Sequence, residues 1–354
     1  MSLTSPLARA ALGAALLVAL VAPVTPAAAA GTAAGLKPVH TGLINTRERL
    51  PPVALRPVVR GMVVDVDWAA LQPTQDGPLA TANEIDLTLA ALRRQRLAGG
   101  PSMTLTLRVL AGTGAPEWAK RLGGEPVPVL DDRRGDDTGS KGVAGTVGRF
   151  WTPAFGRAYE QLQQRLAAAY DDAPEVLVTG ITRCTTYYGE SFLRQAGAPS
   201  VARALYAAGF TPEADLRCLR ESVRAHLAWD RTRSALALNP YQLVRADGRF
   251  TIDVGTTLRA AEDCRAVLGA ACQLANHSLR WPVLTGPYDT LYDGMRRMGS
   301  PLSLQSAAPE RMGDHVAALR WGVELGVDSL ELNRAYLTYD VAELRRLDAA
   351  LLAP

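Results

Sequence analysis

The stretch Val176–Glu190, VLVTGITRCTTYYGE, decides how the rest of the chain is interpreted. It begins as a short apolar run of strand type and ends in two tyrosines and one carboxylate, Glu190. On a barrel of parallel strands, residues just past the C-terminal end of a strand face the open end where ligands bind. That placement favours a functional role for Glu190, whereas a glutamate alone in a loop would be a solvated surface group.

Apolar or alternating runs recur along the chain with helix-periodic segments between them, the pattern of a parallel sheet wrapped by helices. We expect strands at Gly61–Asp67, Met103–Val109, Val176–Thr182, Ser234–Asn239, Cys272–His277, Leu302–Gln305 and Ser329–Leu332. An eighth strand could lie between Glu125 and Phe150, where Val127 and Val129 alternate with prolines, or that region could be a long loop. The expected fold is therefore an α/β protein with a single (β/α)8 barrel domain and an extended loop after its second strand.

Helices are expected between these strands, at Glu84–Arg96, Pro153–Tyr170, Pro212–Asp230, Thr257–Leu268, Asp289–Met298, Asp314–Leu325 and Val341–Leu352. Thr152 and Thr211 each supply a capping hydroxyl and are followed by proline at the first helical position. No Pro/Ser linker divides the chain, so we assign residues 31–58 to an N-terminal extension and 59–354 to the barrel domain.

Alternation within the strands separates a helix-facing set of side chains from an axis-facing set. In TLTLRV (104–109), Leu105 and Leu107 share one face while Thr104, Thr106 and Arg108 share the other. The same rule turns polar residues inward near the ends of the other strands, namely Asp65, Asp67, Asn239, His277, Gln305 and Glu331. Such a polar ring either satisfies itself, for example through Arg108 with Asp65 or Asp67, or binds a ligand.

Aromatic residues follow the same strands, and flat aromatic faces can stack on sugar rings or anchor loops in a core. Together with the polar ring they give the predicted substrate-binding set: Asp65, Asp67, Trp68, Arg108, Trp118, Tyr187, Tyr188, Asn239, Tyr241, His277, Trp281 and Gln305.

The first thirty residues carry one charged side chain, Arg9, then an apolar run and the small residues Pro26–Ala30. This pattern predicts a signal peptide at 1–30 with cleavage near Ala30, and hence a secreted protein without a membrane partner after cleavage; an uncleaved anchor is the alternative. A formal net charge of +3 is too close to neutral to indicate a nucleic-acid partner.

Four cysteines, Cys184, Cys218, Cys264 and Cys272, favour two disulfides, since no CxxC spacing or histidine cluster points to a metal site. Of three connectivities we prefer Cys184 with Cys218 and Cys264 with Cys272, because the second pair is close in sequence. No Gly-rich phosphate loop follows a strand, so we expect neither a metal nor another cofactor.

The segments DVDWAALQPTQDG (65–77) and LTLRVLAGTGAPEWAK (105–120) resemble the opening of the glycoside hydrolases of the large (β/α)8-barrel clan, including its β-galactosidase-like members. WTPAFGRAYEQLQQRLAAAYDDAPEVLVTGI (151–181) resembles the helix and fourth strand that carry the acid/base glutamate there, and Glu190 matches that position. The chain also resembles exported barrel proteins of high-GC bacteria. It departs from the clan in having Gly189 where asparagine usually precedes the glutamate, and in having Gln305 where a nucleophilic glutamate ends the seventh strand.

Because an amide cannot form a glycosyl ester, Gln305 cannot serve as the nucleophile of the ordinary retaining mechanism. One hypothesis is a glycosidase in which Glu190 is the general acid and Glu331, or next Asp65 or Asp67, acts as base or nucleophile; Glu331 on the last strand would suit an inverting mechanism. The alternative is a non-catalytic carbohydrate-binding barrel that lost its nucleophile. A metal-dependent hydrolase is the third class, but the four histidines are spread over different elements.

Overall fold

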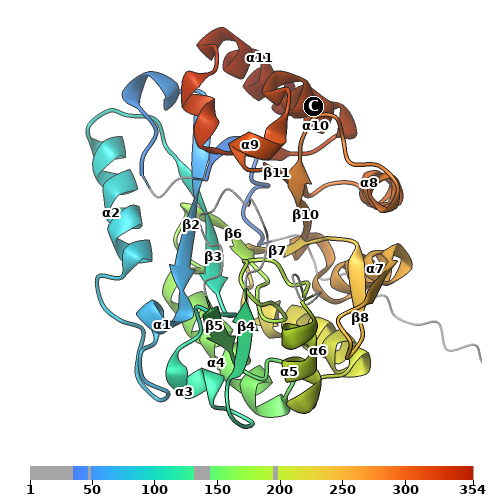
Figure 1. The fold of residues 1–354 in the computed structure, drawn as a ribbon. Helices are drawn as coiled ribbons and strands as arrows, with labels where there is room; N and C mark the ends of the chain where they lie inside the picture. The colour runs from blue at the N-terminus through green and yellow to red at the C-terminus, as the bar shows by residue number, and fades with distance from the viewer. Residues whose placement is uncertain (1–34, 47–48, 131–143, 194–197, 354) are drawn as a thin grey trace, which may run out of the picture. The chain divides into compact units, whose positions relative to one another are not determined.

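The computed structural model describes residues 35–46, 49–130, 144–193 and 198–353. Eight parallel strands close into a barrel in the order β1-β12-β11-β10-β7-β6-β3-β2, with helices around it (Figure 1). The strands are β1 (Gly42–Asn45), β2 (Val59–Asp67), β3 (Thr104–Leu110), β6 (Val176–Gly180), β7 (Arg233–Ala237), β10 (Cys272–Leu279), β11 (Leu302–Ser306) and β12 (Ser329–Leu332). The predicted (β/α)8 fold is confirmed.

All seven predicted strands and all seven predicted helices are present, with ends that shift by a few residues. The long helices are α2 (Glu84–Leu97), α4 (Pro153–Tyr170), α6 (Pro212–Ala225), α7 (Val254–Leu268), α8 (Pro287–Met298), α10 (His315–Leu325) and α11 (Val341–Leu351). Shorter ones are α1 (Trp68–Leu71), α3 (Glu117–Lys120), α5 (Pro199–Ala207) and α9 (Pro309–Met312). Among the described residues, no helix is both long and apolar enough to cross a membrane.

The eighth barrel strand is β1; of the two alternatives for the region between Glu125 and Phe150, a barrel strand there is wrong. That region instead forms an antiparallel pair outside the barrel, β4 (Val127–Leu130) with β5 (Ala144–Val147); residues 131–143 lie outside the described part. β1 pairs in parallel with β2 on one side and β12 on the other, so the barrel begins inside the segment assigned to an N-terminal extension. The extended loop accordingly follows the third barrel strand rather than the second.

Helix starts follow the capping pattern of the sequence. The Thr152 hydroxyl accepts a hydrogen bond from the Phe155 amide, and the Thr211 hydroxyl accepts one from Ala214, each ahead of a first-turn proline. The helix predicted to reach Asp230 ends at Ala225, where the chain tightens into a 3-10 turn. These caps fix where each helix leaves the barrel wall.

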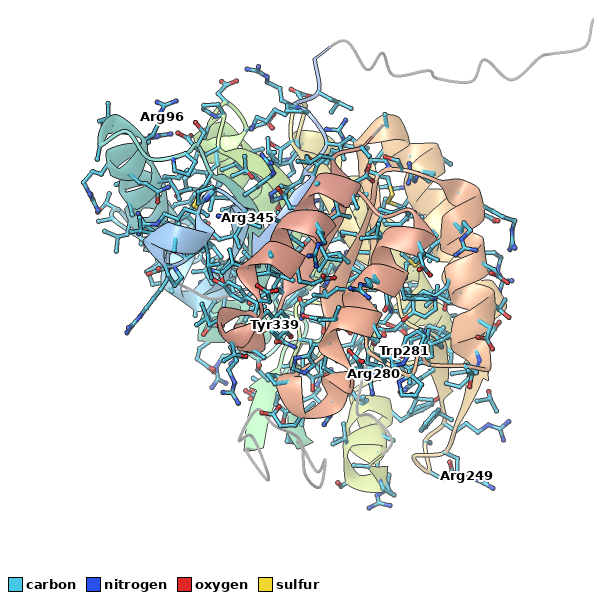
Figure 2. All side chains as sticks on the ribbon, turned by 90° about the horizontal axis from the view of Figure 1, so that it is seen from above. Arg96, Arg249, Arg280, Trp281, Tyr339 and Arg345 are labelled. Atoms are coloured by element: carbon cyan, nitrogen blue, oxygen red, sulfur yellow. A yellow bond between two sulfur atoms is a disulfide. The ribbon has the colours of Figure 1, made fainter. Side chains whose placement is uncertain are left out.

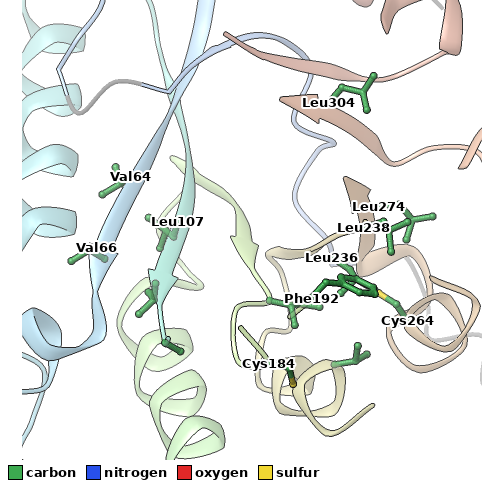
Figure 3. Close-up of a cluster of buried hydrophobic side chains, with 14 of the residues drawn as sticks. Val64, Val66, Leu107, Cys184, Phe192, Leu236, Leu238, Cys264, Leu274 and Leu304 are labelled. Carbon is green, nitrogen blue, oxygen red and sulfur yellow. The ribbon is translucent and has the colours of Figure 1, made fainter. Parts of the chain in front are cut away.

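The predicted alternation places the leucines of the strands between barrel and helices. Leu236, Leu238 and Leu274 are buried in this layer together with Cys264 of α7, and Figure 3 labels all four. Thr104 and Thr106 face the axis instead, where their hydroxyls hydrogen-bond the two ring nitrogens of buried His40 at 2.8 and 3.1 Å. The axis-facing set is thus polar at both ends of β3.

Two disulfides form with the predicted connectivity. Cys184 bonds Cys218 and ties the loop after β6 to α6, whereas Cys264 bonds Cys272 and ties α7 to the start of β10. The loop after β7 carries an antiparallel hairpin, β8 (Tyr241–Val244) with β9 (Phe250–Asp253), and Figure 2 shows Arg249 near its tip.

Candidate functional site

Glu190 lies in the loop after β6, the fourth barrel strand, and is held by residues that end the next two strands of the barrel. The Asn239 amide nitrogen, just past β7, donates to one Glu190 oxygen at 2.6 Å. The His277 Nδ1 atom, on β10, lies 3.4 Å from the other oxygen. The Glu190 side chain keeps 14% exposure and that of His277 8%, so this carboxylate is oriented by two neighbours and still reaches solvent.

A second polar cluster is centred on Arg108 of β3. One guanidinium nitrogen donates to Glu331 of β12 at 2.8 Å; the other donates to Gln305 of β11 at 3.1 Å and to Asp65 of β2 at 3.4 Å. Burial pushes the pKa of Glu331 upward, but the charge and hydrogen bond of Arg108, with the charge of nearby His277, outweigh it and hold that pKa below its ordinary value. Burial likewise opposes the charge on Arg108, but Glu331 and Asp65 outweigh it and keep its pKa above the ordinary value.

The two carboxylates on Arg108 differ in accessibility. The Glu331 side chain is 6% exposed, whereas that of Asp65 is 41% exposed. Asp67, two residues farther along β2, is also exposed and stands at the start of α1 without capping it through its side chain. Glu331 is therefore a buried counter-ion, and Asp65 is the member of this cluster that water can reach.

Gly189 brings the two clusters into contact. A Cβ atom built on this glycine would overlap the Cδ atom of Arg108, so only a glycine lets the loop before Glu190 lie on the arginine. Glu190 adds to the negative charges that favour protonated Arg108. Close packing against Arg108 therefore explains why Gly189 stands where the glycoside hydrolases that the sequence resembles usually have asparagine.

Asn239 is itself fixed by residues that sequence reasoning did not select. The buried Thr257 hydroxyl donates to the Asn239 carbonyl at 2.8 Å and accepts from the Tyr241 amide at 2.9 Å. The Tyr288 hydroxyl of α8 donates to the Asn239 side-chain oxygen at 3.4 Å, which leaves the amide nitrogen for Glu190. Tyr288 follows a barrel strand like the other aromatics and could have been found; Thr257 carries no sequence signal.

Two of the predicted substrate-binding aromatics are core residues. Trp68 is 0% exposed, packs edge-on against Trp118 at 5.4 Å between ring centres, and donates to the Gln72 side chain. Tyr241 is buried and donates to Asp215 at 3.1 Å. Large aromatics after a strand have filled the space between barrel and helices, so a ligand cannot reach these two rings.

The remaining aromatics are at least partly exposed. Trp118 is partly buried against the core and donates to the Gln72 carbonyl. Tyr187 donates its hydroxyl to Val129 of β4, and the carbonyl of Tyr188 accepts from Thr185 inside the same loop. Trp281, after β10, is the most exposed of them. Among the described residues, no three His, Cys, Asp or Glu side chains are grouped to hold a metal ion.

Comparisons with known proteins give structural neighbours only. No family model matches the chain, and no curated protein matches it. The catalytic domain of β-amylase from Paenibacillus polymyxa superposes with a TM-score of 0.52 at 11% identity, over 90% of this chain and 100% of that one. A β-galactosidase from Rahnella sp. R3 gives 0.52 at 15% identity, over 90% of this chain and 57% of that one.

Endo-glycoceramidase II from Rhodococcus sp. covers 84% of this chain with a TM-score of 0.46. At such identities the likeness concerns architecture alone. The chain shares its closed-barrel fold with the β-amylase and the β-galactosidase above.

Proposed function

We propose that this protein hydrolyses O-glycosidic bonds of an oligo- or polysaccharide, with Glu190 as the general acid. One observation carries the proposal. Glu190, after the fourth barrel strand, is contacted by Asn239 and His277 and is still accessible to solvent. Glycosidases need a carboxyl group positioned to protonate the departing oxygen, and active sites of such barrels lie at this end of the strands. The neighbours' names, β-amylase and β-galactosidase, support a carbohydrate substrate.

Asp65 is the better second carboxylate in this proposal, although the sequence ranked Glu331 first. A general base must meet a water molecule, and Asp65 is exposed while Glu331 is buried on Arg108. Gln305 at the end of the seventh strand lacks the carboxylate needed for a glycosyl ester. An inverting reaction, in which Asp65 activates water while Glu190 protonates the leaving group, uses the accessible groups.

Secretion belongs to the same proposal. The apolar segment 10–21 with small residues up to Ala30 is typical of a signal peptide. Two disulfides are typical of an oxidising compartment outside the cytosol. An extracellular polysaccharide would be available there.

A turnover screen of the purified protein against aryl glycosides and polysaccharides tests the proposal. Glu190→Gln should lower kcat/KM at least about 100-fold, the ordinary contribution of a general acid. Glu324→Gln, on the exposed face of α10, is the matched control and should leave turnover unchanged. Equal activity in wild type and Glu190→Gln would refute the role of Glu190.

The two candidate second carboxylates can be separated with Asp65→Asn and Glu331→Gln. We expect Asp65→Asn to abolish turnover and to cost less stability than Glu331→Gln, because the Asp65 carboxylate is exposed and Glu331 still balances Arg108. Glu331→Gln should mainly destabilise the fold, since it leaves buried Arg108 with less countercharge. Normal turnover by Asp65→Asn would show that Asp65 is not the general base and that another carboxylate has this role.

One observation favours the second candidate function, a carbohydrate-binding barrel without turnover. Arg108 donates hydrogen bonds to both Gln305 and Glu331, and Gln305 stands where the glycoside hydrolases that the sequence resembles have their nucleophile. This reading predicts saccharide binding by wild type and by Glu190→Gln alike, with no product from any substrate in the screen.

A further inference from the structure

Trp281 differs from the other tryptophans of the chain in its exposure. Its side chain is 41% exposed, whereas Trp68, Trp151 and Trp229 are buried and Trp118 and Trp321 pack partly buried against the core. Within the described residues, its ring has no aromatic neighbour and its Nε1 atom has no hydrogen bond. A large apolar surface has been left open to solvent at this position.

The backbone of Trp281 is fixed although its ring is open. Its amide donates to the Met312 carbonyl at 2.8 Å, and a parallel bridge joins it to Gly313 at the end of α9. Gly313 has φ +66°, and a Cβ atom there would overlap the Trp281 carbonyl oxygen. The ring is therefore presented by a backbone held through its amide and its bridge to Gly313, with no room for a side chain at Gly313.

Trp281 stands close to the proposed catalytic groups along the chain. It follows His277 by four residues of mostly extended chain, a span of at most about 13 Å. Arg280 lies beside it in Figure 2, and the Arg280 Nε atom donates to the Ser278 carbonyl at 3.3 Å. An exposed aromatic face can stack on the apolar CH surface of a sugar ring, and a neighbouring guanidinium can donate hydrogen bonds to the hydroxyl groups of that ring.

We propose that Trp281 is a stacking platform for a sugar ring outside the catalytic position, and that the ligand is therefore an extended polysaccharide. The inference rests on the proposed function and narrows its substrate class, because a platform outside the catalytic position can be used only by a ligand with more than one sugar ring. Rigid presentation lowers the entropy lost when the ring binds, which is what a platform for a flexible chain requires.

Affinity electrophoresis in native gels containing hydroxyethyl cellulose, xylan, soluble starch or galactomannan tests the platform without requiring turnover. Wild type should be retarded by at least one of these polymers. Trp281→Ala should bind that polymer about three- to tenfold more weakly, the range expected for one aromatic stacking contact. Trp281→Phe keeps an aromatic face and should retain most of the retardation. Leu97→Ala removes an exposed apolar side chain at the end of α2 and should behave as wild type.

Kinetics then distinguish this inference from the proposed function. If the protein is a glycosidase, Trp281→Ala should raise KM for the polymer by a larger factor than KM for an aryl glycoside. If the polymers retard the protein in a way that depends on Trp281, and no substrate is turned over, the stacking role of Trp281 is supported and the proposed hydrolase activity is refuted. Absence of retardation in wild type, or equal retardation in Trp281→Ala, would overturn the platform. So would a change of oligomeric state in Trp281→Ala on size-exclusion chromatography, which would make the ring an interface between copies.

Discussion

Glu190, Asn239 and His277 come from distant parts of the sequence, yet strand alternation and strand ends were enough to predict that they meet. Burial of single aromatics was not predictable in the same way, because Trp68 and Tyr241 follow strands like Trp281 does but fill the core. The sequence offers no sign of which rings find space between barrel and helices. The contacts of Thr257 were not predictable either, because a threonine in the first turn of a helix is common and says nothing about its partners.

Gly189 provides a residue-scale prediction. Gly189→Ala should destabilise the protein by about 1–3 kcal/mol, the usual cost of forcing an atom into a packed site, because the new Cβ must displace Arg108. It should also reduce turnover or binding by moving Glu190. Urea unfolding monitored by tryptophan fluorescence measures the first effect. Gly35→Ala, where a Cβ meets nothing within 4 Å, serves as control; equal stabilities of the two variants would contradict the steric role.

Tyr288 gives a second prediction at this scale. Tyr288→Phe removes the donor to the Asn239 side-chain oxygen, so the amide is less firmly directed at Glu190. Because donation from Asn239 favours ionised Glu190, its loss should move the alkaline limb of the kcat/KM profile to higher pH. A purely structural role would lower stability and leave the shape of the pH profile unchanged.

Among the elements, the long helices and most strands could be predicted because periodicity and caps are local signals. Strand β1 could not, since four buried residues show no alternation and their pairing partners lie in β2 and β12. Conversely, Val127 and Val129 alternate with prolines as an edge strand does, and they form a hairpin outside the barrel. Short strands are defined by tertiary pairing rather than by their own sequence.

The two disulfides give an element-scale prediction. Cys184–Cys218 closes 34 residues and Cys264–Cys272 closes 8. In the chain-entropy model, removing them costs about 3.8 and about 2.5 kcal/mol respectively. We therefore expect the Cys184→Ala/Cys218→Ala pair to be less stable than the Cys264→Ala/Cys272→Ala pair in urea titrations. Only the first should also weaken the site, because Cys184 lies in the loop that leads to Glu190; the reverse order would contradict this account.

For the whole molecule, three fully buried groups set the pH dependence of stability. Burial lowers the pKa of His40 to about 4 and that of His226 to about 3, and it raises the pKa of Asp215 to about 7. Near pH 5 each histidine takes up about one proton on unfolding, whereas Asp215 releases about one; toward pH 6.5 the uptake by each histidine falls to about half a proton. The net uptake of one proton means that stability rises with pH by up to about 1.4 kcal/mol per unit.

Asp215→Asn removes the opposing group, so the slope near pH 5 should approach about 2.7 kcal/mol per pH unit, the sum of the two histidines. Free energies of unfolding from urea titrations at pH 5, 5.75 and 6.5 measure it. Asp76→Asn, at an exposed loop position, should keep the wild-type slope. A slope unaltered by Asp215→Asn would show that this carboxyl does not hold a proton in the folded protein.

The pairing of β1 with both β2 and β12 also determines when the barrel can form during folding. Gly42 pairs with Ser329, so closure joins segments separated by most of the chain, and this non-local contact must wait until β12 is available. Until then β1 is paired with β2 along one edge only, and its other edge is unpaired. The strand at the far end of the unclosed sheet also has one unpaired edge. Open strand edges are templates for pairing with other chains, so the unclosed barrel is the species most exposed to aggregation.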